Sequence, residues 1–418
     1  MRHSSAADAL PATIRLHFIG DIMLFGRYDA YAEQQEAAHV FNAIAPTLQE
    51  ADYVIGNMEC VFTHAASPRN DKLCLQGHPA YAPALRQAGL THLGLANNHS
   101  FDFGTAGFQD TRAHLEAAGI VSFGAGYDLA TSLTPVFLSQ GDITLGMLAA
   151  CDESTKPAAL AADDHAGAAP LIIDELLTRI QSLRQQVDHV IVMLHWGFEY
   201  SEYPTPEQAI MARQAIDAGA SVVIGHHSHM LQGIEHYQGG IIAYSLGNFT
   251  DSAVDWQGPE RRYQSELTTA DRESIILAIT FSKQGIEHVV SRPIWLSDTG
   301  QPQPADAAQA ERISAKLEAR SQSLDPAALA QHWQQAVVSS RVFGPLLHWW
   351  QSGSLLDKIR RFNLGQLKSG YLLLAMFIRV KLSRSQQKWS LLNPRNDTRP
   401  MPSAGQEGNS ATDRSKRP

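Results

Sequence analysis

Residues 215–229 read AIDAGASVVIGHHSH, and the order of residue types in this stretch decides the fold class. Residues 215–219 are typical of a helix end, because a glycine just past a helix readily takes the left-handed conformation that stops it. Residues 222–224 are apolar and β-branched, which indicates a short strand buried on both faces. Three histidines, at positions 226, 227 and 229, follow the strand. One segment therefore contains a helix end, a buried strand and a polar strand terminus.

The same order of features recurs from residue 13 to about residue 300. Residues 205–208 (TPEQ) form a capping box with proline at the first helical position, which predicts a helix start. Strands that alternate with helices predict an α/β fold. The first apolar run alternates with Arg15 and His17, which predicts a half-exposed or edge strand. The apolar runs are 14–19, 53–55, 92–96, 190–194, 221–224 and 241–244, and the helix-like runs that end in glycine are 85–89, 114–119 and 215–219.

Composition and charge exclude several classes of protein. The chain has 418 residues, of which 44% are hydrophobic and 18% charged, as in a soluble globular protein. Its formal net charge of -9 argues against a basic nucleic-acid binder. The cysteines Cys60, Cys74 and Cys151 include no C-x-x-C pair, which argues against a disulfide framework or a cysteine zinc site. A reducing compartment is indicated, and a single Cys60–Cys74 bridge stays open.

The sequence predicts three parts: an α/β domain over 13–300, a helical extension over 301–390 and a disordered tail over 391–418. Within the extension, residues 341–390 hold nine Lys or Arg against one acidic residue. This segment fits either an interfacial helix on an anionic membrane or a helical pair that covers the domain with solvated lysines. Apolar residues at helical spacing in it are Leu372, Leu373, Met376, Phe377 and Val380.

Neither a signal-peptide core near the N-terminus nor the roughly 18 apolar residues of a spanning helix occurs in the sequence. We therefore expect a cytoplasmic protein. If the interfacial helix forms, we expect peripheral contact with a membrane through residues 341–390.

Polar side chains follow five of the apolar runs, at the point where each predicted strand ends. Ligands of open α/β sheets bind in the crevice at the carboxyl ends of the strands, so these side chains are expected to converge. Carboxylate, amide and imidazole groups together suit Zn²⁺, Mn²⁺ or iron. His227 and His229 point to the same side if their segment is extended. Taken singly, a Gly-Asp or Asn-Asn pair is usually a turn and a histidine after a strand can be a core residue, but the joint arrangement favours a metal site. The polar segments are 20–21, 57–59, 97–102, 195–197 and 225–229.

As a set these segments, together with residues 244–249 (YSLGNF), resemble the calcineurin-like metallophosphoesterases, and more closely the CapA family associated with poly-γ-glutamate capsule synthesis. The resemblance covers residues 14 to 250 and implies a four-layer α/β sandwich of metallophosphoesterase type, here with a helical C-terminal extension. It also implies two divalent metal ions, with manganese, zinc and iron as the candidates. His99 would be the proton donor, oriented by Asp102, and Arg27 is either an anion clamp or a surface arginine. The implied metal ligands are Asp21 and Glu59, with Glu59 as the bridge, Asn98, His195 and His227 on one metal, and His229 on the other.

Two positions depart from the wider phosphoesterase pattern. Met23 stands where a histidine is usual, which leaves one metal short of a ligand, and Ser100 stands where an acidic residue usually follows the Asn-His pair. His226 can substitute for a neighbouring ligand. Both departures are typical of the CapA branch, in which phosphatase activity is less certain than the fold.

Two functions follow from the resemblance. The first is a metal-dependent hydrolase of CapA type, a phosphoesterase acting on a phosphoester or anionic polymer in capsule, poly-γ-glutamate or exopolymer biosynthesis. The second is a non-catalytic, metal-containing accessory or polymer-binding component of a capsule synthesis or export complex. The net charge argues against a nuclease, so no specific nucleic-acid partner is expected.

Overall fold

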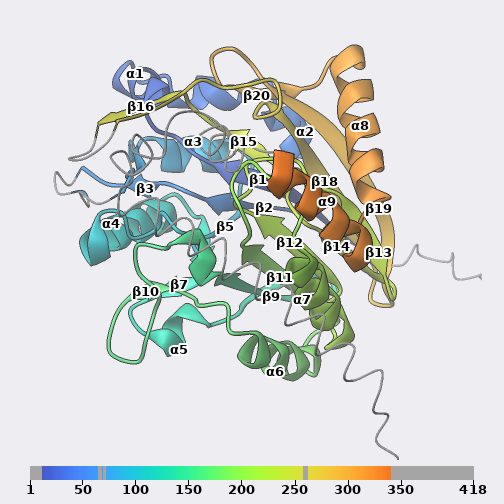
Figure 1. Ribbon diagram of the computed structural model, residues 1–418. Helices are drawn as coiled ribbons and strands as arrows, with labels where there is room; N and C mark the ends of the chain where they lie inside the picture. Colours follow the sequence, from blue (N-terminus) through green and yellow to red (C-terminus); the bar gives the residue numbers. More distant parts are fainter. Residues whose placement is uncertain (1–11, 65–67, 69–71, 258–261, 340–418) are drawn as a thin grey trace, which may run out of the picture. The chain divides into compact units, whose positions relative to one another are not determined.

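Two β-sheets form the middle of the computed structural model, which describes residues 12–64, 68, 72–257 and 262–339 (Figure 1). In the first sheet the strands run in the order β20-β19-β18-β1-β2-β5-β6, and β15 also pairs with β1. β1, β2, β5 and β6 are parallel, whereas β18 is antiparallel to β1. The strands are β1 (Ile14–Ile22), β2 (Tyr53–Met58), β5 (His92–Gly94), β6 (Val121–Phe123), β15 (Asn248–Thr250), β18 (Glu273–Phe281), β19 (Ile286–Leu296) and β20 (Pro302–Pro304).

The second sheet has the order β13-β14-β12-β11-β9-β8, with a parallel centre and one antiparallel strand at each edge. Its strands are β8 (Val136–Gln140), β9 (Ile143–Cys151), β11 (His189–His195), β12 (Val222–His226), β13 (Ile234–Tyr237) and β14 (Gly240–Ala243). Short strands outside both sheets pair two by two: β3 (Val61–Phe62) with β4 (Gln76–Gly77), β7 (Ala125–Gly126) with β10 (Gly167–Ala168), and β16 (Val254–Gln257) with β17 (Arg262–Ser265).

Helices connect the parallel strands, and their ends follow the sequence signals. Thr205 and Gln208 cap α7 reciprocally, as the capping box predicted. Gly89, Gly119 and Gly219 all have positive φ just past a helix, which confirms the predicted helix stops. The helices are α1 (Arg27–Glu33), η1 (Ala37–Phe41), α2 (Ala45–Leu48), α3 (Tyr81–Ala88), α4 (Gly104–Ala117), α5 (Leu129–Ser132), η2 (Glu153–Thr155), α6 (Ile173–Arg184), α7 (Pro206–Asp217), α8 (Ala307–Ser321) and α9 (Pro326–Ser339).

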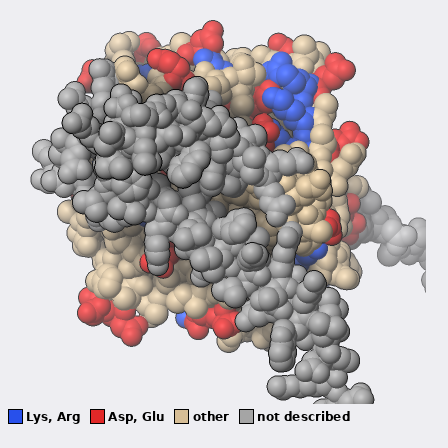
Figure 2. Space-filling view, viewed as in Figure 1, with Lys and Arg blue, Asp and Glu red and all other residues tan. Residues whose placement is uncertain are grey.

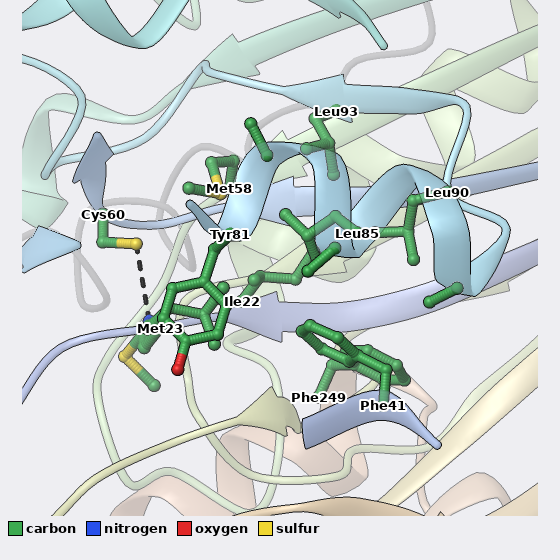
Figure 3. Packing of buried hydrophobic residues seen from close by; sticks show 14 of the residues in the cluster. Ile22, Met23, Phe41, Met58, Cys60, Tyr81, Leu85, Leu90, Leu93 and Phe249 are labelled. Atoms are coloured by element: carbon green, nitrogen blue, oxygen red, sulfur yellow. Dashed lines mark hydrogen bonds between the residues drawn. The ribbon is translucent and has the colours of Figure 1, made fainter. Parts of the chain in front are cut away.

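Three apolar clusters separate the layers. Along β11, Ile191 and Met193 face the cluster between the two sheets, whereas Val192 and Leu194 face a second cluster with α6 and α7. A third cluster packs η1, α2, α3 and α4 on the outer face of the first sheet; Figure 3 shows part of it, with Tyr81 and Leu85 beside Ile22 and Phe41. Helices, sheet, sheet and helices therefore follow one another, and the predicted four-layer α/β class is confirmed.

The first strand differs from its prediction. β1 lies between β18 and β2, so it is a central strand and the expectation of an edge strand was wrong. Arg15 is exposed at its start, but His17 is fully buried. β18 supplies the missing neighbour from more than two hundred residues further along the chain, which no local pattern reveals.

His17 should make stability depend on pH. Burial, with the charge of Arg292, lowers its pKa from 6.5 to about 4. The unfolded state therefore takes up a proton near pH 6.5 and the folded state only near pH 4, so protonation destabilises the fold as pH falls between these values. Between pH 7.5 and pH 5, we expect the free energy of unfolding to fall by about 2 kcal/mol less in His17→Leu than in the parent. Urea unfolding at both pH values measures this, and identical losses in parent and variant would contradict it.

The chain divides into two units, Met1–Val338 and Ser339–Pro418. The predictions for residues 341–390 and 391–418 lie outside the described residues, and the predicted boundary at residue 300 stays a prediction. In the described part, no helix has the length and hydropathy required to cross a membrane. Cys60, Cys74 and Cys151 form no disulfide with one another, so the bridge that the sequence left open is not formed.

Candidate metal centre

The predicted polar strand ends converge between the two sheets. Asp21 lies one residue before the end of β1, Glu59 follows β2, and Asn98 and His99 follow β5; these three strands belong to the first sheet. The second sheet contributes His195 at the end of β11 and His227 and His229 just after β12. All seven side chains are buried.

Two clusters of potential ligands share one carboxylate. Glu59 with His195 and His227 forms the first cluster, and Glu59 with Asp21 and His229 forms the second; within each, the ligand atoms lie within 4.8 Å of one another. Glu59 Oε1 lies 3.4 Å from His195 Nε2 and 3.9 Å from His229 Nε2. This is the arrangement expected if Glu59 bridges two ions.

An amide extends the first cluster. Asn98 Oδ1 lies 2.9 Å from His195 Nε2, which is close to the roughly 3 Å that separates neighbouring ligands of a six-coordinate ion at about 2.1 Å. The grouping of Asn98, His195 and His227 that the resemblance implied is therefore brought together. Asn57, which had no assigned role, donates from Nδ2 to Asp21 Oδ1 over 2.9 Å. Asn97 donates in turn to Asn57 Oδ1 and to the Met58 carbonyl, and so fixes the turn before Asn98.

The histidine loop after β12 is not extended, contrary to the prediction. His227 and His229 have φ values of 95° and 58°, in the left-handed region that bulky residues rarely adopt. At the start of the loop, a Cβ on Gly225 would lie 1.9 Å from the Tyr244 carbonyl oxygen, so β12 passes too close for a side chain. The two histidines face Glu59 because the loop curls around it.

The charges in the centre are poorly compensated without a cation. Burial and the neighbouring Asp21 raise the pKa of Glu59 well above its usual range. Burial acts in the same direction on Asp21, but the imidazoles of His226 and His229, 3.0 and 3.5 Å from its oxygens, hold the pKa of Asp21 well below the usual range. Burial also lowers the pKa of His195 strongly, and that of His227 to about 3, so both rings are neutral, as metal ligands must be.

His229 is the exception among the histidines. Although burial opposes it, the charges of Glu59 and Asp21 raise the pKa of His229 well above its usual value. The proton that His229 holds therefore supplies positive charge beside the two carboxylates, as a bound cation would. Glu59 Oε1 and His227 Nδ1 are buried without a hydrogen-bond partner in the described part of the chain, which is expected for atoms arranged to bind an ion. The residues present fit a pair of divalent cations.

A second group of charges adjoins the ligands. His99 Nδ1 donates to Asp102 Oδ2 over 2.6 Å, as predicted for an oriented histidine. Lys72 Nζ lies 2.9 Å from Asp102 Oδ1 and donates to the Asn98 carbonyl over 2.7 Å. Sequence reasoning missed Lys72, because its loop shows no motif. Burial raises the pKa of Asp102 but His99 and Lys72 outweigh it, so this carboxylate is ionised; burial lowers the pKa of His99.

Arg27 is not brought to the ligand clusters. Its guanidinium donates to Ser252 Oγ and to the Asp298 carbonyl, and it lines a shallow cavity of about 330 Å³ with Tyr31 and Thr299. None of these residues belongs to the two clusters. The choice between an anion clamp and a surface arginine stays a prediction.

The two departures from the phosphoesterase pattern have structural explanations. Met23 packs in the outer apolar cluster near Tyr81 and Cys60, so its side chain belongs to the core (Figure 3). His226 Nδ1 lies 3.0 Å from Asp21 Oδ1 and thus brings a further imidazole to the cluster that Met23 leaves short. Ser100 donates to the Leu95 carbonyl and to Asn97 Oδ1, which stabilises the turn.

The family model described as "Bacterial capsule synthesis protein PGA_cap" matches residues 15–253. The chain belongs to this family of capsule synthesis proteins, and the predicted relation to CapA is confirmed. It is 34% identical over 236 residues to the PGA biosynthesis protein CapA of Bacillus subtilis (strain 168), covering 56% of this chain and 62% of that protein. It is 32% identical over 244 residues to the capsule biosynthesis protein CapA of Bacillus anthracis, covering 56% and 59%.

A further relative is a probable polyglutamine synthesis accessory protein of Mycobacterium tuberculosis (strain ATCC 25618 / H37Rv), 31% identical over 227 residues, covering 52% of this chain and 60% of that protein. The chain thus spans about three fifths of the length of these curated relatives. Among solved structures, a novel phosphatase from Mycoplasma pneumoniae aligns with a TM-score of 0.45 at 14% identity, over 72% of this chain and 98% of that one. A putative 5'-nucleotidase from Staphylococcus aureus aligns with a TM-score of 0.42 at 14% identity, over 74% and 58%. These two similarities are too low to inform on activity.

Proposed function

We propose that this protein is a metal-dependent hydrolase of CapA type, a phosphoesterase that acts in capsule, poly-γ-glutamate or other exopolymer biosynthesis. The observation that carries the proposal is that two ligand clusters, each drawn from the strand ends of both sheets, share buried Glu59. A phosphoester or an anionic polymer is the proposed substrate, and a capsule synthesis complex the proposed setting.

Each cluster would hold one divalent ion, of manganese, zinc or iron. Asn98, His195 and His227 would hold the first, Asp21 and His229 the second, and Glu59 both. Such a pair of ions lowers the pKa of a bound water and stabilises the attacking and leaving oxygens of an in-line displacement at phosphorus. The chain itself excludes water from the ligands, which are buried. Asn57 and His226 contact Asp21 from two sides and so fix its position.

His99 is the proposed proton donor. Its Nδ1–H is donated to Asp102, so Nε2 can give a proton to a leaving oxygen only from the doubly protonated ring, a form that burial opposes and the Asp102 charge favours. Lys72 and the Leu75 amide both contact Asp102, and this keeps the carboxylate ionised and the His99 ring oriented. A group with this support is what acid catalysis requires, and a purely structural metal site does not need it.

One observation favours a second candidate, a metal-containing accessory or polymer-binding component with no turnover. Met23 lies in the apolar core, so the second cluster lacks the ligand that the wider phosphoesterase pattern places there. The mycobacterial relative, which is named an accessory protein, also agrees with this candidate.

Metal content separates the candidates. We expect elemental analysis of the purified full chain to find close to two metal ions per chain, together with hydrolysis of a generic phosphomonoester or phosphodiester. His227→Ala and Asp21→Ala should each remove one ion and the hydrolysis, whereas His236→Ala, at an exposed histidine of β13, should change neither. Bound metal without turnover in the parent would support the accessory role. No metal in the parent would refute the metal centre.

A further inference from the structure

The helices α8 and α9 follow the family-matched region, which ends at residue 253, yet they contact two loops of the candidate centre. One loop, residues 197–204, comes after the ligand His195. The other, residues 230–234, comes after the ligand His229. Figure 1 shows both helices, in orange, beside β13 and β19.

Arg320, near the end of α8, contacts both loops with a single guanidinium. Nη1 donates to the Leu231 carbonyl, and Nη2 forms an ion pair with Glu202 Oε1 at 2.7 Å. Arg320 is only 6% exposed, which is rare for an arginine without a paired and hydrogen-bonded role. These two contacts satisfy the buried guanidinium.

Further contacts hold the same two loops. Ser321 Oγ accepts from the Ile234 amide over 2.9 Å, and a Cβ on Gly233 would lie 2.7 Å from the Arg320 carbonyl oxygen, so loop and helix lie in direct contact. In α9, Trp333 Nε1 donates to the Pro204 carbonyl over 2.8 Å. The His332 ring stacks on Tyr203 with ring centroids 4.4 Å apart.

The two loops in turn contact the second ligand cluster and each other. The Tyr200 amide donates to the Ser228 carbonyl over 2.7 Å, and the Tyr200 ring lies 6.1 Å from that of His229. Gln232 Nε2 donates to the Ser201 carbonyl over 2.8 Å. A chain of contacts therefore runs from Arg320 through both loops to the backbone on either side of His229, whose φ of 58° needs support from its surroundings.

We infer that Arg320 is a positioning residue for the metal centre: by joining the 197–204 and 230–234 loops it holds His229 in place for the second ion. The inference rests on the proposed metal centre. It assigns part of the metal affinity to a helix outside the family-matched region. Loss of groups that orient a metal ligand typically weakens metal binding by about 10- to 100-fold.

Arg312 provides a matched control on the same helix. It forms an ion pair with buried Glu273 at 2.7 Å and lies over Trp295, and these partners are on β18 and β19, so neither belongs to the two loops. Lys and Arg side chains gather at the upper right of Figure 2, in the area where Figure 1 draws α8. Loss of Arg312 removes the same charge from the same helix but leaves the Arg320 contacts intact.

The test measures metal binding to full-length protein stripped of metal, by calorimetric titration with Mn²⁺ or Zn²⁺. Arg320→Gln should weaken one of two binding steps at least 10-fold and leave the other within about twofold. Arg320→Lys, which can keep one contact, should recover part of the loss, and Arg312→Gln should change neither step even where its melting temperature falls as far. Equal affinities in Arg320→Gln and the parent, or losses in both arginine variants that follow melting temperature, would overturn the inference.

Hydrogen exchange of the metal-free proteins provides an independent measurement. Arg320→Gln should speed exchange in residues 226–234 relative to the parent and to Arg312→Gln, and unchanged exchange would again reject the inference. If the parent binds no metal, the proposed function fails, but this comparison still decides whether Arg320 orders the loop. If Arg320→Gln does not fold, Glu202→Ala, which removes one of the two contacts, takes its place in both measurements.

Discussion

Glu59→Gln is expected to reduce bound metal from about two ions per chain to nearly none, the largest loss of any single substitution in the centre. Both clusters depend on this carboxylate, and an amide of the same shape has neither the negative charge nor the second anionic oxygen needed to bridge two cations. Elemental analysis beside Asp21→Ala, which leaves the first cluster complete, measures the difference. Glu287→Gln, at an exposed position of β19, removes the same charge and should retain both ions.

The metal-free Glu59→Gln protein should be at least as stable as the metal-free parent. Burial raises the pKa of Glu59, so the fold gains when this charge is removed, and loss of metal cannot then be ascribed to unfolding. With metal in excess the order reverses, because only the parent gains about 2.7 kcal/mol at a free-metal concentration 100 times the Kd. Retention of one ion by Glu59→Gln would show that the clusters do not share a bridge.

His99→Gln is expected to lower the hydrolytic rate about 10²- to 10⁴-fold while both metal ions stay bound. The doubly protonated His99 ring can give a proton from Nε2 to the leaving oxygen, and glutamine cannot, although it fills similar space. Asp102→Asn should also slow the reaction, because an amide no longer holds Nδ1–H and the ring can take the wrong tautomer. Steady-state rates on the phosphoester that the parent hydrolyses, with metal content measured on the same samples, test both variants.

His288→Gln, at an exposed histidine of β19, is the control for general effects of losing an imidazole. A His99→Gln protein that keeps more than a tenth of the parent's rate would remove His99 from the chemistry. In that case the leaving oxygen would not depend on proton transfer from this side chain.

The parallel strands and their helices could be predicted because their signals are local. Each glycine stop, the capping box at Thr205 and each short β-branched run lie within a few residues of the structure that they determine. The antiparallel strands β18 and β19 were not among the predicted runs, since no alternating helix marks them. The same omission made β1 look like an edge strand. Arg15 and His17 suggested an exposed face, but His17 is buried and its strand pairs with β18, which comes from far along the chain.

The convergence of the candidate ligands could be predicted for a related reason. Asp21, Glu59 and His195 all lie at the carboxyl ends of parallel strands, and parallel strands bring those ends to one edge. Lys72 and Arg320 could not be predicted, because Lys72 contacts the centre from a loop and Arg320 contacts the flanking loops from a helix end, and both positions depend on tertiary packing. Arg27 follows the same strand as Asp21, but its guanidinium contacts Ser252 and Asp298.

The two sheets contribute to the centre in nearly equal measure: Asp21, Glu59 and Asn98 from one, His195, His227 and His229 from the other. A bound ion would therefore link the two layers, and the affinity of the centre for that ion should depend on the distance between the sheets. If the proposed metal centre forms, a cavity made deep in the inter-sheet cluster, at Met147 or Ile279, is expected to let the layers shift and to change metal affinity without altering any ligand. Substitutions in the core are then expected to act on metal binding as well as on stability.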